Sequence, residues 1–262
     1  MNDKSKPRPY HAAETVSTAI AEKPVHAVVS WRDKMVAITA QAAASEAPKG
    51  GFLSFKGGIM SYDETPIPNN KMEVVVIDFL LENAIFAEKY NANKPASPMC
   101  YAFGRDEKTM GPHENSSDPQ SELCHNCPNN EWGSNPEGGR GKACKNSRRI
   151  AIMHADALRD GPDGVEKANT IMCKIPVTSI QNFSRYINQC TKVLGKPPFG
   201  VVCELSVKPS VNMFEVQWKV IDDVKSDELM EALYNKHVSI DRQLHQHYPA
   251  NEQDAKPASK KY

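Results

Sequence analysis

The chain has 262 residues, of which 40% are hydrophobic, so it can bury a substantial apolar core in one large or two small domains. Its 32 lysines and arginines balance 32 aspartates and glutamates, which excludes the strongly basic composition of many nucleic-acid-binding proteins. Residues 1–9 are polar, and the longest apolar run, Val74 to Leu81, is too short to cross a bilayer. We therefore expect a soluble, intracellular protein that is not secreted and has no membrane partner.

The two ends of the chain differ in composition from the middle. Residues 1–24 and 249–262 are rich in proline and in small or polar residues, which predicts mobile tails. Residues 30–47 are rich in alanine and lack glycine and proline, so they predict one helix that is capped by Ser30 and ends before Pro48. Residues 25–248 are expected to form a single domain.

The middle of the chain has the pattern of short strands joined by turns. The expected strand regions are 52–62, 71–81, 150–153, 170–175, 201–207 and 213–221. The first region is expected to be a hairpin around Lys-Gly-Gly, and the last two a hairpin around Lys-Pro-Ser-Val-Asn. Helices are expected at 179–195 and from 226 to about 247, because each segment begins at a serine and has spaced apolar residues.

The order of these elements predicts the fold class. A parallel α/β sheet needs a helix between successive strands, and the two expected hairpins break that alternation. Five or more short strands with one long insertion predict an α+β protein, mainly antiparallel β, built as a barrel of the oligonucleotide-binding type with a few helices. The insertion is expected at residues 100–149.

Seven cysteines are present, and the reducing compartment expected for this chain makes disulfides a poor explanation for them. Cys173, Cys190 and Cys203 each stand alone in apolar surroundings. This context predicts that all three are small buried hydrophobic side chains.

The other four cysteines form a group with metal-ligand spacing. Cys100, Cys124, Cys127 and Cys144 are separated by 23, two and 16 residues. The central Cys-x-x-Cys is a turn that presents two thiolates to one metal ion, and the two flanking cysteines complete a tetrahedral zinc site. His113 is an alternative fourth ligand in place of Cys100. A simpler alternative is that the four cysteines are unrelated.

A zinc ion here is expected to be structural. The intervening sequence is rich in glycine, proline, asparagine and serine, so it cannot bury enough apolar surface to become ordered without a metal. A catalytic site would keep one coordination position open beside a general base, and the deaminase signature is absent because Glu114 stands directly after His113. Phosphate-binding glycine loops and nucleophile elbows are also absent, so we expect no enzyme activity.

Residues 50–155 carry an ordered set of short motifs: Ser54-Phe-Lys-Gly-Gly, Pro68-Asn-Asn-Lys-Met, Cys100-Tyr-Ala-Phe-Gly, Cys124-x-x-Cys127, Trp132-Gly-Ser and Gly141-Lys-Ala-Cys144-Lys-x-x-Arg148-Arg149. In this combination the chain resembles a family of tailed-bacteriophage proteins that is mostly uncharacterised. A looser similarity, in architecture alone, is to the single-stranded DNA-binding protein of T-even phages, where a zinc subdomain is inserted in an oligonucleotide-binding barrel. The family itself brings no established activity with it, so the expectation of a role in DNA replication or recombination in the cytoplasm of the host cell comes from the looser similarity.

Local basic and aromatic residues agree with a nucleic-acid partner. The basic candidates are Arg140, Lys142, Lys145, Arg148 and Arg149, with Lys56 in the Phe-Lys-Gly-Gly turn as a weaker one. The aromatic candidates are Tyr101, Phe103 and Trp132. Phosphates would bind the basic residues, and unpaired bases would stack on the rings. Alternatively, Trp132 packs over the metal turn, Phe103 belongs to the core and the basic run is a solvated surface.

Two main hypotheses follow, with a third held in reserve. The first is a phage-encoded single-stranded DNA-binding protein with a structural zinc ion. The second is an interaction module that docks on a host or phage replication or transcription factor. The third, a zinc hydrolase or nuclease, has the weakest support in the sequence.

Overall fold

The computed structural model describes residues 30, 31, 34, 35, 38, 39, 51–87, 96–210 and 213–248. Contacts divide the chain into two units, Met1–Ala47 and Pro48–Tyr262, and each is described by itself. In the first unit Trp31 and the described residues 34, 35, 38 and 39 are helical, in agreement with the helix expected at 30–47. The rest of that helix and the tails expected at 1–24 and 249–262 lie outside the described residues.

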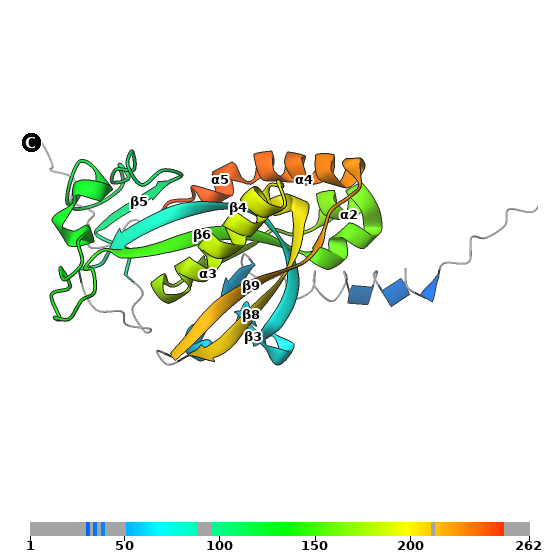
Figure 1. Ribbon diagram of the computed structural model, residues 1–262, viewed down its shortest axis with the longest axis horizontal. Helices are drawn as coiled ribbons and strands as arrows, with labels where there is room; N and C mark the ends of the chain where they lie inside the picture. Colours follow the sequence, from blue (N-terminus) through cyan, green and yellow to red (C-terminus); the bar gives the residue numbers. More distant parts are fainter. Residues whose placement is uncertain are drawn as a thin grey trace, which may run out of the picture. The chain divides into compact units, whose positions relative to one another are not determined.

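The described part of the second unit is a mixed α+β fold in which nine strands form one curled, mainly antiparallel sheet (Figure 1). The strands are β1 (Phe52–Ser54), β2 (Ser61–Tyr62), β3 (Thr65–Pro66), β4 (Lys71–Ile85), β5 (Cys100–Gly104), β6 (Lys145–His154), β7 (Ile171–Ile175), β8 (Val201–Ser210) and β9 (Met213–Asp223). The α-helices of this part are α2 (Gly161–Lys167), α3 (Val177–Asn188), α4 (Asp227–Ser239) and α5 (Asp241–Leu244).

The strand order is β3-β2-β1-β7-β6-β4-β8-β9, and β5 also pairs with β4. Strand β4 is the centre of the sheet, because it pairs with β6 along one edge and with β8 and then β5 along the other. The turn between β1 and β2 packs against β8 and β9, so the sheet is strongly curled. The closed barrel of the oligonucleotide-binding type is not confirmed, because β3 and β9 end the strand order without pairing among the described residues.

The expected strands and hairpins are confirmed, and several run further than the pattern indicated. Strand β4 continues to Ile85 and β6 begins at Lys145, so both extend into the predicted cysteine insertion. The helix expected at 179–195 is α3 followed by a π-helical turn, Gln189–Val193. The helix expected at 226–247 is α4 with the short α5, and the Ser226 hydroxyl caps it by accepting a hydrogen bond from the Leu229 N–H (3.3 Å).

Two apolar cores lie on opposite faces of the sheet. Val74 and Val76 of β4 belong to the core that α3 covers, whereas Val75 and Ile77 belong to the core that α2, α4 and α5 cover. This alternation follows from the two-residue period of a strand, and it makes β4 apolar on both faces. Figure 1 shows α4 and α5 along one side of the sheet and α3 on the other.

The three solitary cysteines lie in the core under α3. Cys173, Cys190 and Cys203 are buried free thiols, which confirms the prediction for them. Burial raises the pKa of each, so they remain neutral thiols. In the part of the chain that the structure describes, no helix has both the length and the apolar character needed to cross a membrane.

Candidate metal centre and the surface beside it

The register of the sheet brings two of the four grouped cysteines together. Cys100 is the first residue of β5 and pairs with Ile85 at the end of β4. On the other side of β4, Lys145 pairs with Ala84, so Cys144 comes directly before the first residue of β6 at the same end. Cys100 and Cys144 therefore flank the end of β4 although 43 residues separate them in the sequence.

The Cys-x-x-Cys turn covers this end of the sheet. Residues Cys124–Asn126 form a 3₁₀ turn, and both cysteines of the motif are buried. The Cys124 N–H donates to the Met110 carbonyl (2.8 Å), and the Cys144 N–H donates to the Asn129 carbonyl (2.8 Å). The first hydrogen bond fixes the turn to Met110, and the second joins the residue before β6 to Asn129, two residues after the Cys-x-x-Cys motif.

All four cysteines line one small cavity. Its volume is about 20 Å³, which is room for a single water-sized particle. The other lining residues include Asn83, Tyr101 and Gln120. Spacing alone predicted this convergence, and the structure places the four side chains around a common space.

The charges of the four thiols are coupled. Burial, followed by the neighbouring Cys124, Cys100 and Cys127, raises the pKa of Cys144 to about 12. Burial also raises the pKa of Cys100 and Cys124, while hydrogen bonds from the Gln120 backbone to Cys100 and from the Asn83 side chain to Cys124 act in the opposite direction. Thiolates are the form that binds metal, and a bound cation would offset the mutual repulsion that raises the pKa of Cys100, Cys124 and Cys144.

The donor chemistry fits zinc. Four sulfur ligands are a common set for structural Zn²⁺, and Cys100, Cys124, Cys127 and Cys144 are the residues that could hold it. Among residues 51–87, 96–210 and 213–248, no group of three or more histidine, cysteine, aspartate or glutamate side chains is already arranged to hold a metal ion. Zinc therefore stays a prediction.

The alternative ligand His113 takes part in different contacts. Its ring stacks on Tyr101, with ring centroids 4.9 Å apart. Its Nδ1 lies 3.1 Å from the Tyr101 hydroxyl and accepts a hydrogen bond from the Asn115 N–H (3.1 Å). His113 does not belong to the residues that line the cavity, so this arrangement favours Cys100 as the fourth ligand.

The structure separates the predicted nucleic-acid contacts into exposed and engaged side chains. Lys56, Trp132, Arg140 and Lys145 are exposed, and Lys142 is half-buried. Tyr101 is buried, and Phe103, Arg148 and Arg149 are largely covered. Lys56 lies in the turn between β1 and β2 that packs against β8 and β9. The remaining exposed candidates belong to the segment that carries the four cysteines or lie directly after it.

Trp132 lies near Lys142, and Arg140 and Lys145 are exposed neighbours of Lys142 in the sequence; we call these four residues the Trp132 surface (Trp132, Arg140, Lys142 and Lys145). The Trp132 side chain is 74% exposed, which is contrary to the expectation that it packs over the metal turn. The Lys142 Nζ lies 5.3 Å from the centre of the Trp132 ring. Hydrogen bonds from the N–H groups of residues 133 and 135 to the Gly141 carbonyl hold the two sides of this loop together.

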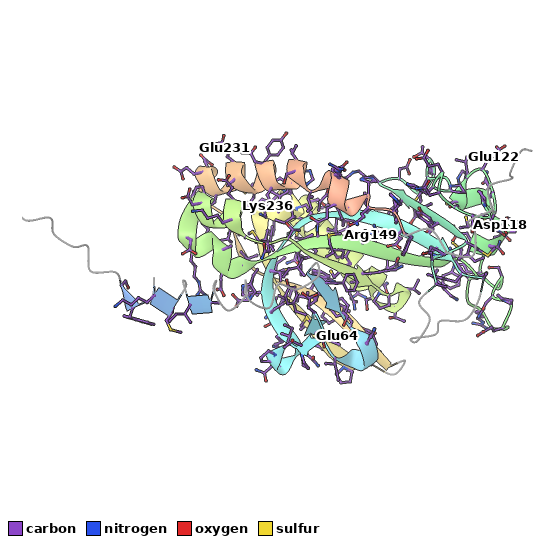
Figure 2. The ribbon with its side chains drawn as sticks, turned by 180° about the vertical axis from the view of Figure 1, so that it is seen from behind. Glu64, Asp118, Glu122, Arg149, Glu231 and Lys236 are labelled. Atoms are coloured by element: carbon purple, nitrogen blue, oxygen red, sulfur yellow. The ribbon has the colours of Figure 1, made fainter. Side chains whose placement is uncertain are left out.

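Arg149 and Phe103 are engaged with the protein itself. The Arg149 guanidinium lies 4.1 Å from the centre of the Phe103 ring and forms an ion pair with Glu82 (Nε–Oε2 3.4 Å). Arg149 lies between the sheet and the end of α5, where it donates to the Leu244 carbonyl (3.1 Å; Figure 2). Arg148 is also mostly covered and pairs with Glu107 (3.5 Å).

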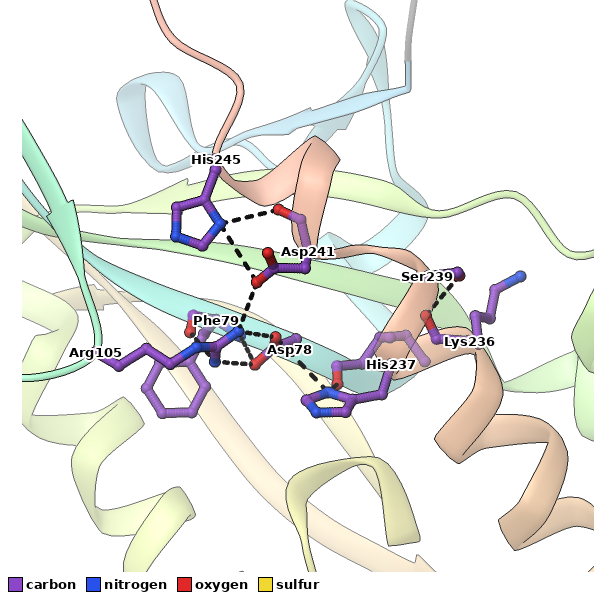
Figure 3. A network of polar contacts seen from close by, with 9 residues as sticks. Asp78, Phe79, Arg105, Lys236, His237, Ser239, Asp241 and His245 are labelled. Atoms are coloured by element: carbon purple, nitrogen blue, oxygen red, sulfur yellow. Dashed lines mark hydrogen bonds and ion pairs between the residues drawn. The ribbon is translucent and has the colours of Figure 1, made fainter. Parts of the chain in front are cut away.

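Two buried carboxylates on β4 were missed as site residues by the sequence analysis. Glu82 is fully buried and also pairs with Lys174 (2.9 Å). Asp78 is 5% exposed, and both of its oxygens accept from the Arg105 guanidinium at 2.7 and 2.9 Å. Arg105 also pairs with Asp241 of α5 (3.1 Å), so this network joins the helix to the sheet (Figure 3). The sequence signal that could have identified these carboxylates is a charged residue within an apolar strand pattern.

Comparison of the chain with protein-family models, with curated proteins and with solved structures found no match. The resemblance to tailed-phage proteins therefore stays a prediction. The function has to be argued from the cysteine group and the surface beside it.

Proposed function

We propose that this protein binds single-stranded DNA through the Trp132 surface, with one structural zinc ion held by Cys100, Cys124, Cys127 and Cys144. The observation that carries the proposal is a tryptophan ring 74% exposed with a lysine ammonium 5.3 Å from its centre. Binding of single strands without sequence preference combines these two elements, an aromatic ring for stacking and cations for the phosphates. Arg140 and Lys145 add positive charge to the same loop.

The zinc ion explains how this loop becomes a defined surface. Residues 105–144 lie between β5 and β6, and they are anchored to the sheet by a small apolar cluster around Ala102, Met110 and Cys124 and by polar contacts such as the hydrogen bond from the His113 N–H to the Tyr101 carbonyl (2.7 Å). A metal that ties Cys124 and Cys127 to the two cysteines at the end of β4 would hold Trp132 in place. The zinc ion is then a scaffold and not a catalytic centre.

The biological setting rests on the looser similarity to a phage single-stranded DNA-binding protein. It places the protein in phage DNA replication or recombination in the host cytoplasm, with phage or host replication proteins as further partners. The contact surface belongs to the segment between β5 and β6, so the proposal does not depend on a closed barrel.

A titration of labelled oligothymidylate at two salt concentrations tests the proposal. Trp132→Ala should weaken binding about fivefold to 100-fold, the range for loss of one stacked base. Trp31→Ala, which removes another exposed tryptophan, is the matched control. Neutralising Arg140, Lys142 and Lys145 should reduce the salt dependence by about 0.7 in log–log slope for each lost phosphate contact.

Binding that is absent, or that is insensitive to salt, would contradict the proposal. Loss of a protein partner in the Trp132 variant, with DNA affinity unchanged, would support the docking-module hypothesis in its place.

A further inference from the structure

The end of α5 continues into a segment that crosses the sheet beside the cysteine centre. We call residues 245–248 the C-terminal strap. Its last residue, Tyr248, lies against Tyr101 and Phe103, with ring centroids 5.1 and 6.2 Å apart. The Tyr248 ring is also 5.5 Å from the Arg149 guanidinium carbon and 5.9 Å from the Lys174 Nζ. The strap therefore covers residues that the sequence predicted to contact nucleic acid.

The covered face of the sheet carries excess positive charge. Arg149 and Lys174 face a single carboxylate, Glu82, which is fully buried between them. One positive charge in this group is therefore not balanced by an acid within it. The end of α5 and the strap offer Arg149 neutral acceptors, because Arg149 donates to the backbone carbonyls of Leu244 and Gln246.

The strap presents two kinds of group that a nucleotide also has, an aromatic ring and hydrogen-bond acceptor oxygens. It places an aromatic ring next to Phe103 and Tyr101, and it places acceptor oxygens on the Arg149 guanidinium. The Tyr248 hydroxyl further bonds to Glu82 and accepts from the Lys174 ammonium (3.2 Å). A base would occupy the position of the ring, and phosphate oxygens would supply the negative charge that carbonyls lack.

We infer that the sheet face under the strap is a second stacking site for single-stranded DNA, filled in this structure by the chain's own Tyr248. The site consists of Tyr101, Phe103, Arg149 and Lys174. This inference rests on the proposed function, and it extends the contact surface from the Trp132 surface to the sheet. DNA that reaches this face has to displace the strap. The affinity for DNA is therefore lower than it would be if the Trp132 surface and this face were both open.

The test uses the full chain and labelled oligothymidylate. Tyr248→Ala should bind at least about fivefold more tightly than the unaltered protein, because a base no longer competes with the ring. Tyr248→Phe keeps the ring but loses the hydroxyl contacts with Glu82 and Lys174, so its gain in affinity should be smaller than that of Tyr248→Ala. Phe103→Ala in the Tyr248→Ala background should remove the gain. Tyr234→Ala on α4, where the side chain is 56% exposed, is the control.

A measurement on the unaltered protein tests the same inference without variants that could fail to fold. Added oligothymidylate should speed hydrogen exchange at the amides of residues 245–248. It should slow exchange at the residues of the Trp132 surface. Unchanged or weaker binding by Tyr248→Ala, or slower strap exchange with DNA, would overturn the inference and leave the Trp132 proposal standing. Failure of every variant and of the unaltered protein to bind would overturn both.

Discussion

The centre of the sheet and the segment between β5 and β6 reach an ordered structure by different means. Strand β4 has apolar side chains on both faces, and each face packs into its own core of buried residues. Residues 105–144 contain two 3₁₀ turns and part of a small apolar cluster, and three of their cysteines line one cavity with Cys100 of β5. The first region is stabilised by the burial of apolar side chains away from water. The second buries few apolar side chains and is held by hydrogen bonds and ion pairs and, in our proposal, by a zinc ion.

The sheet contains a buried ionic cluster next to β5, and breaking this cluster should have the largest effect. Glu82→Ala leaves Arg149 and Lys174 covered without their carboxylate partner, which should lower the free energy of unfolding by about 3–5 kcal/mol. Glu73→Ala, at an exposed position of the same strand, is the control and should change little. Denaturant unfolding measures both, and equal losses would show that the cluster adds no stability.

A cavity in the sheet core should cost somewhat less. Ile152 is fully buried in the core under α3, so Ile152→Ala should lower the free energy of unfolding by about 3 kcal/mol. Ile221 is 41% exposed on β9, and Ile221→Ala should cost much less. If the two variants unfold at the same denaturant concentration, apolar burial does not account for the stability of the sheet.

The ionic cluster should also make stability depend on pH. Burial acts to raise the pKa of Glu82, but Lys174, Arg149 and the Tyr248 hydroxyl together lower it below its ordinary value. A carboxylate whose pKa is lower in the folded state stabilises the protein above its unfolded pKa of about 4.3, and this stability is lost as pH falls through the folded value. Glu82→Gln should therefore show a smaller decline of unfolding free energy below about pH 4 than the unaltered protein. An identical decline would assign the acid sensitivity to other groups.

The smallest effect is expected at a helix end away from both regions. Ser226→Ala removes the hydroxyl that caps α4 and should lower the free energy of unfolding by about 1 kcal/mol. Ser184→Ala, at an exposed position inside α3, should cause no loss. Thermal unfolding of the two variants distinguishes them, and an unchanged Ser226→Ala protein would contradict the capping role.

Sequence patterns predicted the apolar part of the fold well because alternation reports burial directly. They underestimated β4, since Glu82 and Asn83 continue the strand with polar side chains that the fold buries. Strand β5 was missed because its five residues stand at the start of an apparent insertion, and α2 was missed because it begins with Gly161-Pro-Asp-Gly, a sequence typical of turns.

The candidate site was predictable only where neighbours in sequence suffice. The spacing of the four cysteines predicted that they line a common cavity. The roles of Phe103 and Arg149 depend on which strands lie side by side and on where residues 245–248 cross them, and one sequence does not report that. Their residue types were noticed correctly, but their cover by Tyr248 was not foreseen.

Metal content is the measurement that bears most directly on the difference between the two regions. Elemental analysis of the freshly purified protein should find one zinc ion per chain, and a Cys124→Ser, Cys127→Ser variant should lose it while the sheet keeps its protection from hydrogen exchange. Protein that contains no zinc, with the thiols at 100, 124, 127 and 144 freely reactive in the native state, would contradict the account.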